Sequence, residues 1–211
     1  MKRLHIIFLL SFVCCWSVCT ADEADILAKI SANGTAITTI ESHFVQRKHV
    51  KAFKNDVLSS GRFYYQKDDK ICMAYERPKG DLLLMNADEF VMVVDGKRSA
   101  ANAQSNPMLK QMRTLLTACV SGDFERLKSG RNAKISVTET EKNYILTTIF
   151  EGSAKKYYAN IVLTFDKGNL SLLTLRMNEA NGNFTEYTFD RPVFNQKIDA
   201  KIFNTENRVH F

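Results

Sequence analysis

The stretch from Ile71 to Val94 reads ICMAYERPKGDLLLMNADEFVMVV, in which three apolar runs are separated by two short polar turns. Turns of this length between strand-like runs predict antiparallel neighbours in one sheet. An antiparallel strand with one wet face alternates apolar and polar residues, but neighbours in Leu82–Met85 and Phe90–Val94 are all apolar. The pattern therefore predicts a sheet that is covered on both faces in this region.

Two architectures account for the second covered face. One is an ordinary β-sandwich core, and the other is a curved sheet whose concave face forms an apolar cavity. In the second case the helix expected over Met108–Cys119 would serve as a lid, because unbranched methionine side chains repack around varied ligands. A methionine stripe is also common in ordinary cores, so this pattern leaves both architectures open.

The rest of the chain extends the sheet in both directions. Apolar alternation and turn residues predict about ten strands, which span Ile40–Val50, Leu58–Gln66, Ile71–Glu76, Asp81–Met85, Phe90–Val94, Lys134–Thr140, Tyr144–Phe150, Tyr157–Asp166, Leu170–Asn178 and Phe184–Asp190. The expected helices are one that Asp22 or Asp25 caps and Asn33-Gly34 ends, one over Met108–Cys119 after the cap Asn106, and one over Asp123–Lys128. These elements predict an α+β fold that is mainly β, with helices on one side of a large curled antiparallel sheet.

Residues 1–21 have the three parts of a secretory signal peptide. Lys2 and Arg3 precede an apolar run over Leu4–Val13, and small or polar residues follow up to Ala21. The apolar run is too short to span a bilayer. We therefore expect residues 22–211 to form one domain that works outside the cytoplasm.

Charge and motifs argue against several classes of function. The formal net charge of +6 falls to +4 without Lys2 and Arg3, and the basic residues are spread along the chain, which argues against a nucleic acid partner. The sequence has no His-x-x-x-His or Cys-x-x-Cys pair, no Gly-x-Ser-x-Gly and no glycine-rich phosphate loop. We expect no catalytic residues, no metal and no cofactor; an enzyme whose residues come from distant strands is the alternative.

Cys72 and Cys119 are the cysteines outside the signal segment. We expect two buried free thiols that pack as small apolar groups, and a disulfide, which an oxidising compartment permits, is the alternative. Within the signal segment Cys14 and Cys19 each follow a valine, whereas a lipid attachment site needs a small residue before the cysteine.

Three stretches carry a resemblance to a known family. The first is the strand Ile40–Gln46 with its Phe-x-Gln core, and the second runs from Gly61 through the Glu76-Arg77-Pro78 turn to Val93. The third is Ile198–Phe203, which has a late Ile-Asp-x-x-x-Phe pattern. Together they cover about a third of the chain after the signal segment, and in order and spacing they resemble the LolA family of periplasmic lipoprotein carriers.

The resemblance implies an incomplete antiparallel β-barrel of about 10–11 strands, covered by a helical lid over an apolar cavity. It also implies a monomer in the periplasm that binds the acyl chains of lipoproteins or similar amphiphiles. Such a carrier receives its cargo from an inner-membrane ABC-type releasing complex and passes it to an outer-membrane acceptor. A carrier of another acylated lipid and a lipid-binding envelope-stress sensor are the alternatives.

The resemblance also gives candidate site residues. The expected cavity wall is Phe44, Phe63, Tyr65, Ile71, Met73, Leu82, Leu84, Phe90 and Met92, and the expected lid face is Met108, Leu109, Met112, Leu115 and Leu116. The family has an Arg-Pro pair after the second strand whose arginine latches the lid, and Lys67-Asp68 stand there in this chain. Lysine keeps the charge but lacks the planar guanidinium group, so Lys67 is expected to be a weaker or different latch.

Overall fold

The structure is a computed structural model of the 211-residue chain and describes residues 22–128, 133–152 and 158–206. The signal segment expected at residues 1–21 lies outside these ranges. The described strands are β1 (Thr39–His49), β2 (Val57–Gln66), β3 (Lys70–Arg77), β4 (Lys79–Asn86), β5 (Glu89–Val94), β6 (Lys97–Asn102), β7 (Ala133–Glu139), β8 (Asn143–Phe150), β9 (Asn160–Asp166), β10 (Leu172–Asn178) and β11 (Phe184–Phe194).

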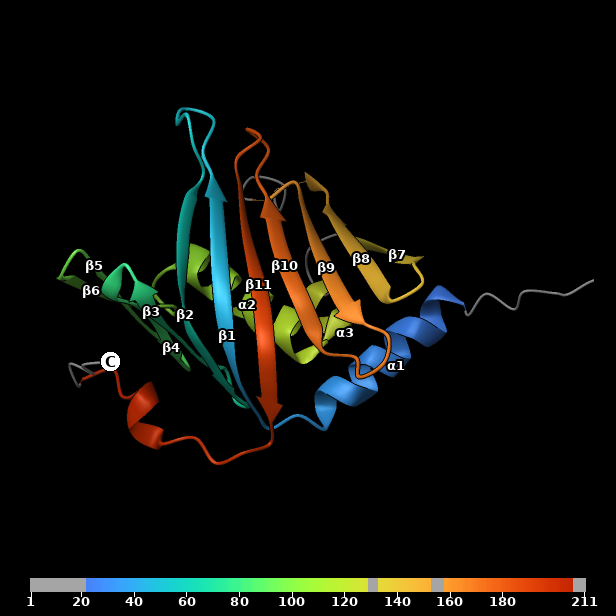
Figure 1. Ribbon diagram of the computed structural model, residues 1–211, viewed down its shortest axis with the longest axis horizontal. Helices are drawn as coiled ribbons and strands as arrows, with labels where there is room; N and C mark the ends of the chain where they lie inside the picture. The colour runs from blue at the N-terminus through green and yellow to red at the C-terminus, as the bar shows by residue number, and fades with distance from the viewer. Residues whose placement is uncertain (1–21, 129–132, 153–157, 207–211) are drawn as a thin grey trace, which may run out of the picture.

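All of these strands belong to one 11-stranded sheet with the order β6-β5-β4-β3-β2-β1-β11-β10-β9-β8-β7 (Figure 1). The first meander, β1 to β6, and the second meander, β7 to β11, meet where β1 pairs antiparallel with β11. No described strand pairs with the outer edge of β6 or β7. The sheet is therefore a curved, incomplete antiparallel barrel, as the resemblance implies.

One strand, β6, is absent from the sequence-based prediction. Its side chains are all exposed, so the stretch has no apolar alternation to mark it. Its pairing is set by the two-residue turn that joins it to β5, in which Asp95 and Gly96 have φ values of 50° and 74°. Positive φ at both central residues matches the type of turn that favours the twist of a β-hairpin. The two basic residues at its start, Lys97 and Arg98, suit an edge strand that stays unpaired.

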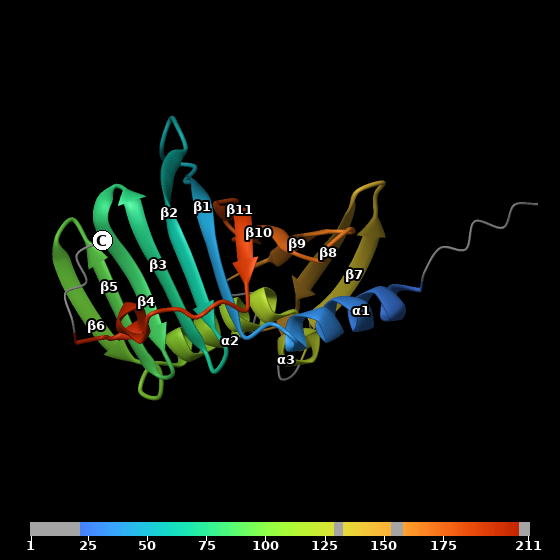
Figure 2. The ribbon, with the colours of Figure 1, turned by 60° about the horizontal axis from the view of Figure 1, so that its bottom comes forward.

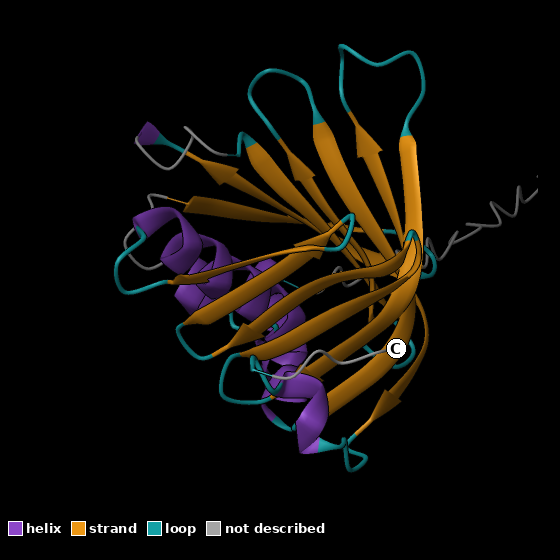
Figure 3. Ribbon diagram, turned by 90° about the vertical axis from the view of Figure 1, so that its left-hand side faces the viewer, coloured by secondary structure: helices purple, strands orange, loops and turns teal. Residues whose placement is uncertain are grey.

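Three described helices, α1 (Glu23–Thr35), α2 (Pro107–Ser121) and α3 (Phe124–Lys128), lie together on the concave side of the sheet (Figure 3). Ile26 and Ile30 bury the apolar side of α1. The predicted cap of α2 is confirmed, because the Leu109 backbone N–H donates to Asn106 Oδ1 at 3.3 Å. Asp22, one of the two residues predicted to cap α1, occupies its N-cap position but makes no side-chain capping bond, and Asp25 lies within the helix.

The convex side is covered over the first meander by the end of the chain. After β11 the chain crosses to β4 and forms a short 3-10 helix, η2 (Ala200–Phe203) (Figure 2). Phe203 is buried against Tyr64, Cys72 and Leu84 on this side, together with neighbouring apolar residues. The two apolar faces of the first meander are thus explained by two covers, the helices on one face and the C-terminal segment on the other.

Cys72 and Cys119 lie on opposite faces of the sheet, which decides whether they can form a disulfide. Cys72 and Cys119 are both buried and are not bonded to each other. Cys72 belongs to the convex cluster, whereas Cys119 is part of α2 and belongs to the core on the concave side. The expected buried thiols are confirmed, and the disulfide alternative is excluded because the sheet lies between the two residues.

Candidate functional site: an apolar space beneath a helical lid

The pairing of the strands decides which side chains face the helices. Residues directly opposite each other on neighbouring strands point to the same face. Two rows therefore cross the first meander on the concave side: Phe63, Met73, Leu83 and Met92 form one, and Tyr65, Ile71, Met85 and Phe90 form the other.

Most of the predicted cavity wall lies on this face. Six of the predicted residues are buried in the core between sheet and helices: Phe44, Phe63, Tyr65, Ile71, Met73 and Phe90. Met92 lies on the same face, opposite Leu83, but its side chain is 42% exposed, so the helices do not enclose it. Whether these residues contact a ligand remains a prediction.

The placement of Leu82 and Leu84 was wrong. They pair with Ala74 and Cys72, which puts them on the convex face. There they are buried with Phe203 of the C-terminal segment and have no part in the wall beneath the helices. In a strand that is apolar on both faces, alternation cannot tell one face from the other, and the residues that do face the helices on β4 are Leu83 and Met85.

The second meander also supplies part of the concave wall, and none of its residues is in the predicted set. Its buried side chains on this face are Tyr144, Leu146, Phe150, Ile161, Leu163, Phe165, Leu175, Met177, Tyr187 and Phe189. The folded strands β8 and β9 alternate between buried and less buried positions. Their sequences do not show this alternation, because Tyr144–Leu146 and Ile161–Leu163 are apolar at consecutive positions.

The predicted lid face is also buried against the sheet. Leu109, Leu115 and Leu116 of α2 belong to the same core, and Met112 is half-buried and packs against it. Met108 lies in α2, but its side chain is outside the part of the chain that the structure describes. The core of the protein thus lies between the concave face of the sheet and α2, and both layers contribute apolar side chains to it.

A set of ion pairs, which we call the latch, ties the helices to two turns at one end of the sheet. Arg113 of α2 pairs with Asp88, in the turn between β4 and β5, and donates to the carbonyl oxygen of Ala87 at 2.8 Å. Arg126 of α3 donates to both carboxylate oxygens of Asp69, in the turn between β2 and β3, at 2.9 and 2.8 Å. The latch residues are Asp69, Asp88, Arg113 and Arg126.

The latch is partly screened from water. The Arg113 side chain is 13% exposed, and its Nε lies 3.8 Å from Asp69 Oδ2. Hydrogen bonds from Arg126 hold the pKa of Asp69 below its usual value of 3.8, against the opposing effect of burial. The Asp88 pKa is also lowered, first by a hydrogen bond from Gln104 and then by Arg113. Both carboxylates are therefore ionised at neutral pH.

Lys67 is not part of this latch. Its Nζ donates to the Thr35 carbonyl oxygen at 3.4 Å, at the end of α1, and its backbone N–H donates to the Thr38 carbonyl oxygen. The arginines of the latch come from the helices and the carboxylates from the sheet, which reverses the arrangement expected around Lys67. A basic residue on the sheet was the only signal that the resemblance offered, so the sequence alone contained no indication of this reversal.

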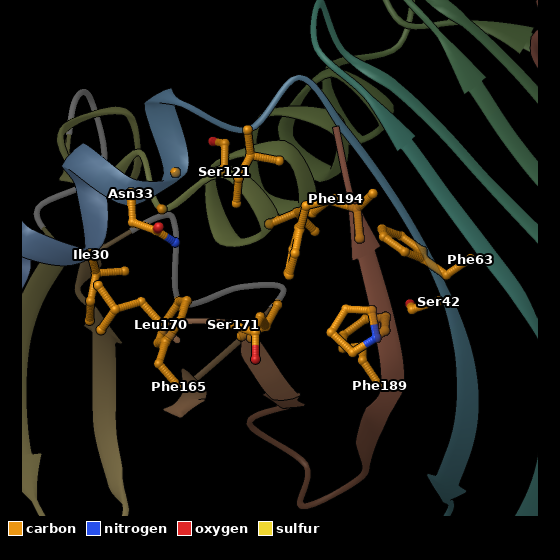
Figure 4. A pocket seen from close by; sticks show the side chains of 17 residues that line it. Ile30, Asn33, Ser42, Phe63, Ser121, Phe165, Leu170, Ser171, Phe189 and Phe194 are labelled. Carbon is orange, nitrogen blue, oxygen red and sulfur yellow. The ribbon is translucent and has the colours of Figure 1, made fainter. Parts of the chain in front are cut away.

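A pocket opens between the end of α1, the end of α2 and the centre of the sheet (Figure 4). It holds about 470 Å³ of empty space, part of which is open to solvent. The space that a water molecule can enter is only about 30 Å³, far below the range of small-molecule sites. In Figure 4, Phe63, Ser42 and Phe189 lie on one side of it, and Ile30, Leu170 and Phe165 lie on the other.

At the opposite end of the concave face the apolar wall contains hydrogen-bonded tyrosines. Phe44 packs edge-to-face on Tyr75 with ring centroids 5.1 Å apart, and Tyr75 donates to Gln46 Oε1 at 2.6 Å. Burial raises the pKa of Tyr75 to about 12 and that of the neighbouring Tyr187 well above its usual value. Both hydroxyls therefore stay neutral, and this end of the wall is uncharged.

No described helix is both long and apolar enough to cross a membrane. No group of three or more His, Cys, Asp or Glu side chains lies close enough to hold a metal ion in the described ranges.

Solved structures are similar to this chain at low sequence identity. An uncharacterized conserved protein from Thermus thermophilus is 6% identical with a TM-score of 0.50, and the similarity covers 87% of this chain and 94% of that one. The LolA superfamily protein from Nitrosomonas europaea is 9% identical with a TM-score of 0.45, covering 89% and 99%. The Mycobacterium tuberculosis lipoprotein LppX is 13% identical with a TM-score of 0.45, covering 84% and 99%.

Sequence comparison gives the family. No curated protein sequence is significantly similar to the chain. Residues 35–206, however, match the family model described as the outer membrane lipoprotein carrier protein LolA. This range includes every described strand of the sheet and both lid helices, α2 and α3. The chain therefore belongs to the LolA family of outer membrane lipoprotein carrier proteins.

Proposed function

We propose that this protein is a periplasmic carrier that binds the acyl chains of a lipoprotein beneath α2 and carries them from the inner to the outer membrane. The observation that supports this most is the interface between α2 and the concave face. It is apolar throughout its centre, while the charged contacts that fix the helices lie at its margin, in the latch.

This division suits a reversible lid. Acyl chains gain about 0.8 kcal/mol for each methylene that they bury, so a fully enclosed chain in an open cavity would be difficult to release. In the closed form Leu109, Leu115 and Leu116 occupy the same apolar surface. Cargo must replace these side chains, and the lost lid contacts offset part of the binding free energy.

The latch makes the closed form specific without making it very stable. Partly exposed ion pairs contribute about 1 kcal/mol or less. An inner-membrane ABC-type complex would deliver the cargo, and an outer-membrane acceptor would accept it by offering a more favourable surface.

The test is a pull-down of tagged protein from the periplasm of its host, followed by mass spectrometry. Co-purified lipid-modified polypeptides are the expected result. A stoichiometric small lipid would instead identify a lipid carrier, and the absence of any acylated ligand would contradict the proposal. In a second assay, acylated peptide should displace an environment-sensitive apolar dye from the purified protein.

A further inference from the structure

The hairpin formed by β1 and β2 carries much of the exposed apolar surface. Among the described residues, eight large apolar side chains are exposed, and four of them belong to this hairpin: Val45, Phe53, Val57 and Leu58. Phe53, in the loop, is 58% exposed, and Leu58, near the start of β2, is 67% exposed. Single apolar side chains on a surface need no explanation, but a group of them on one hairpin indicates a contact with a partner.

The end of this hairpin projects past the neighbouring strand. Pairing of β1 with β2 continues to Lys48 and Val57, whereas pairing of β2 with β3 ends at Ser60 and Arg77. In Figures 1 and 2 the loop between β1 and β2 rises above the turn that joins β3 to β4. The loop can therefore touch a flat surface before the rest of the first meander reaches it.

Hydrogen bonds hold this loop in its shape. The Phe53 backbone N–H donates to the Val50 carbonyl oxygen at 2.8 Å, which closes a turn. The Lys51 backbone N–H donates to Asn183 Oδ1 at 3.0 Å and so ties the loop to the one between β10 and β11. Because the loop is already ordered, a contact through Phe53 costs little conformational entropy.

The end of the hairpin is also basic. Residues 47–58 contain four Lys or Arg residues and one acidic residue, Asp56. Asp56 Oδ1 lies 2.7 Å from His49 Nδ1, and its Oδ2 lies 3.8 Å from Arg47 Nη1. The other basic side chains are exposed and pair with no acidic residue of the described chain: Lys48, Lys51 and Lys54. The neighbouring loop adds one carboxylate, Glu179, which accepts hydrogen bonds from Asn181 and Asn183.

This end of the sheet lies opposite the latch. Consecutive antiparallel strands alternate in direction, so the β1–β2 loop and the β3–β4 turn lie at one end of the first meander. The turns that carry Asp69 and Asp88 lie at the other end. A contact through the hairpin therefore leaves the latch and the lid helices uncovered.

We propose that the end of the β1–β2 hairpin docks this protein on an anionic lipid surface. Phe53 enters the boundary between headgroups and acyl chains, and Lys48, Lys51 and Lys54 lie among the lipid phosphates. Their long side chains reach the phosphates while the aromatic ring lies deeper. A projecting tip offers less area than a stable protein interface buries, whereas it suits weak and reversible binding to a bilayer. The inference concerns the membrane surface and does not depend on the cargo.

The test is flotation of residues 22–211 with lipid vesicles. Vesicles of phosphatidylcholine mixed with phosphatidylglycerol should bind the wild type about tenfold or more tightly than vesicles of phosphatidylcholine alone. High salt should weaken the binding to the anionic vesicles. No binding to either kind of vesicle, or equal binding to both, would overturn the proposal.

Matched variants assign the binding to the hairpin. Phe53→Ala should weaken binding to the anionic vesicles by roughly tenfold, because its ring no longer enters the bilayer. Val193→Ala is the control, since Val193 is 50% exposed at the opposite end of β11. Lys54→Glu should weaken binding by about fivefold or more, and Lys197→Glu, also at an exposed lysine, should have a smaller effect. Equal losses within either pair would show that another surface binds the lipid.

A fluorescent reporter measures insertion directly. The single tryptophan of the chain is Trp16, in the signal segment, so Phe53→Trp places one fluorophore in residues 22–211. Its emission should shift to shorter wavelength on anionic vesicles and be quenched by lipids with brominated acyl chains, and that of Val193→Trp should do neither. Unchanged emission from Phe53→Trp on bound vesicles would overturn the insertion.

Cargo binding is measured separately, without vesicles. Phe53→Ala should bind acylated peptide as the wild type does, since Phe53 lies outside the core beneath the helices. Loss of vesicle binding with peptide binding intact is the result expected for a docking residue. An equal loss of both in Phe53→Ala would overturn the assignment of a separate membrane contact. Failure of the wild type to bind acylated peptide, with vesicle binding intact, would contradict the carrier function alone.

Discussion

Arg126 and Asp69 form two parallel hydrogen bonds, 2.9 and 2.8 Å long, between the short helix α3 and the turn that joins β2 to β3. The planar guanidinium group matches both carboxylate oxygens, which fixes direction as well as distance. Because α3 follows α2 directly, this pair holds the far end of the lid against the rim of the sheet. The ion pair between Arg113 and Asp88 holds the middle of α2 against the rim of the sheet.

Removal of the charge on Asp69 should make the lid open more often. Asp69→Asn keeps the size of the side chain but replaces the ion pair by weaker neutral hydrogen bonds. A loss of about 1 kcal/mol corresponds to roughly a fivefold increase in opening. Stopped-flow uptake of an apolar dye measures it. Asp190→Asn, an exposed carboxylate that pairs with Arg191 away from the helices, is the control. Equal uptake rates in the two variants would contradict the role of the latch.

Acid should open the lid through the same group. The pKa of Asp69 in the folded protein lies below its ordinary value of 3.8, chiefly because Arg126 donates to it. Its stabilising effect is therefore complete above about pH 4 and is lost as the pH falls through the lowered pKa. Dye uptake by the wild type should accelerate in that window. In Asp69→Asn this part of the pH dependence should be absent, and a persisting acceleration of equal size would assign it to other groups.

A charge on the lid face should prevent retention of cargo. Met112 is half-buried against the core, and Met112→Asp places a carboxylate on that surface. We expect roughly a tenfold or greater loss of acyl-peptide affinity with the fold retained, measured by dye displacement and circular dichroism. Lys110→Asp, an exposed residue on the same helix, is the matched control. Undiminished binding by Met112→Asp would show that α2 is not the lid.

Gly34 is a residue at which α1 and α2 approach each other closely. A Cβ atom there would lie 1.8 Å from the Ser121 carbonyl oxygen, so Gly34→Ala must push the helices apart. We expect a loss of about 1–3 kcal/mol in unfolding free energy, measured by urea denaturation. Gly168→Ala, whose Cβ would meet only the flexible Asp166 side chain at 3.1 Å, should cost far less. Similar losses in both variants would argue against a tight helix contact.

The C-terminal segment should stabilise the fold without affecting the ligand. Phe203 is 2% exposed on the convex face, and Phe203→Ala should lower the unfolding free energy by about 3–5 kcal/mol. Phe53→Ala, at a phenylalanine that is 58% exposed, should change it by about 0.5 kcal/mol or less. Acyl-ligand affinity should be the same in both. A selective loss of affinity in Phe203→Ala would mean that the two faces of the sheet are coupled.

Local patterns in the sequence were sufficient for most of the fold. The cap Asn106 located α2, and the turns between apolar runs located the strands of both meanders. Strand β6 could not be found in this way, because a strand without buried side chains has no apolar pattern. Its Asp95-Gly96 turn was the available signal, and it identifies a hairpin only when the second strand is also considered.

The candidate site was harder to predict than the fold. The side of the sheet on which Leu84 lies depends on the register between β3 and β4 and on where the distant Phe203 packs. Neither is contained in the local sequence.

The seam between β1 and β11 has a consequence for the order in which the protein folds. Each meander can assemble from hairpins whose turns are local and fast to form. The seam pairs residues as distant in sequence as Ile40 and Phe194, and contacts at such separation form late. The two meanders therefore cannot join until β11, near the end of the sequence, is available to pair with β1. Until then their concave faces stay uncovered. A chain cut off before β11 would form two separate stacks of hairpins and could not form a smaller version of the same container.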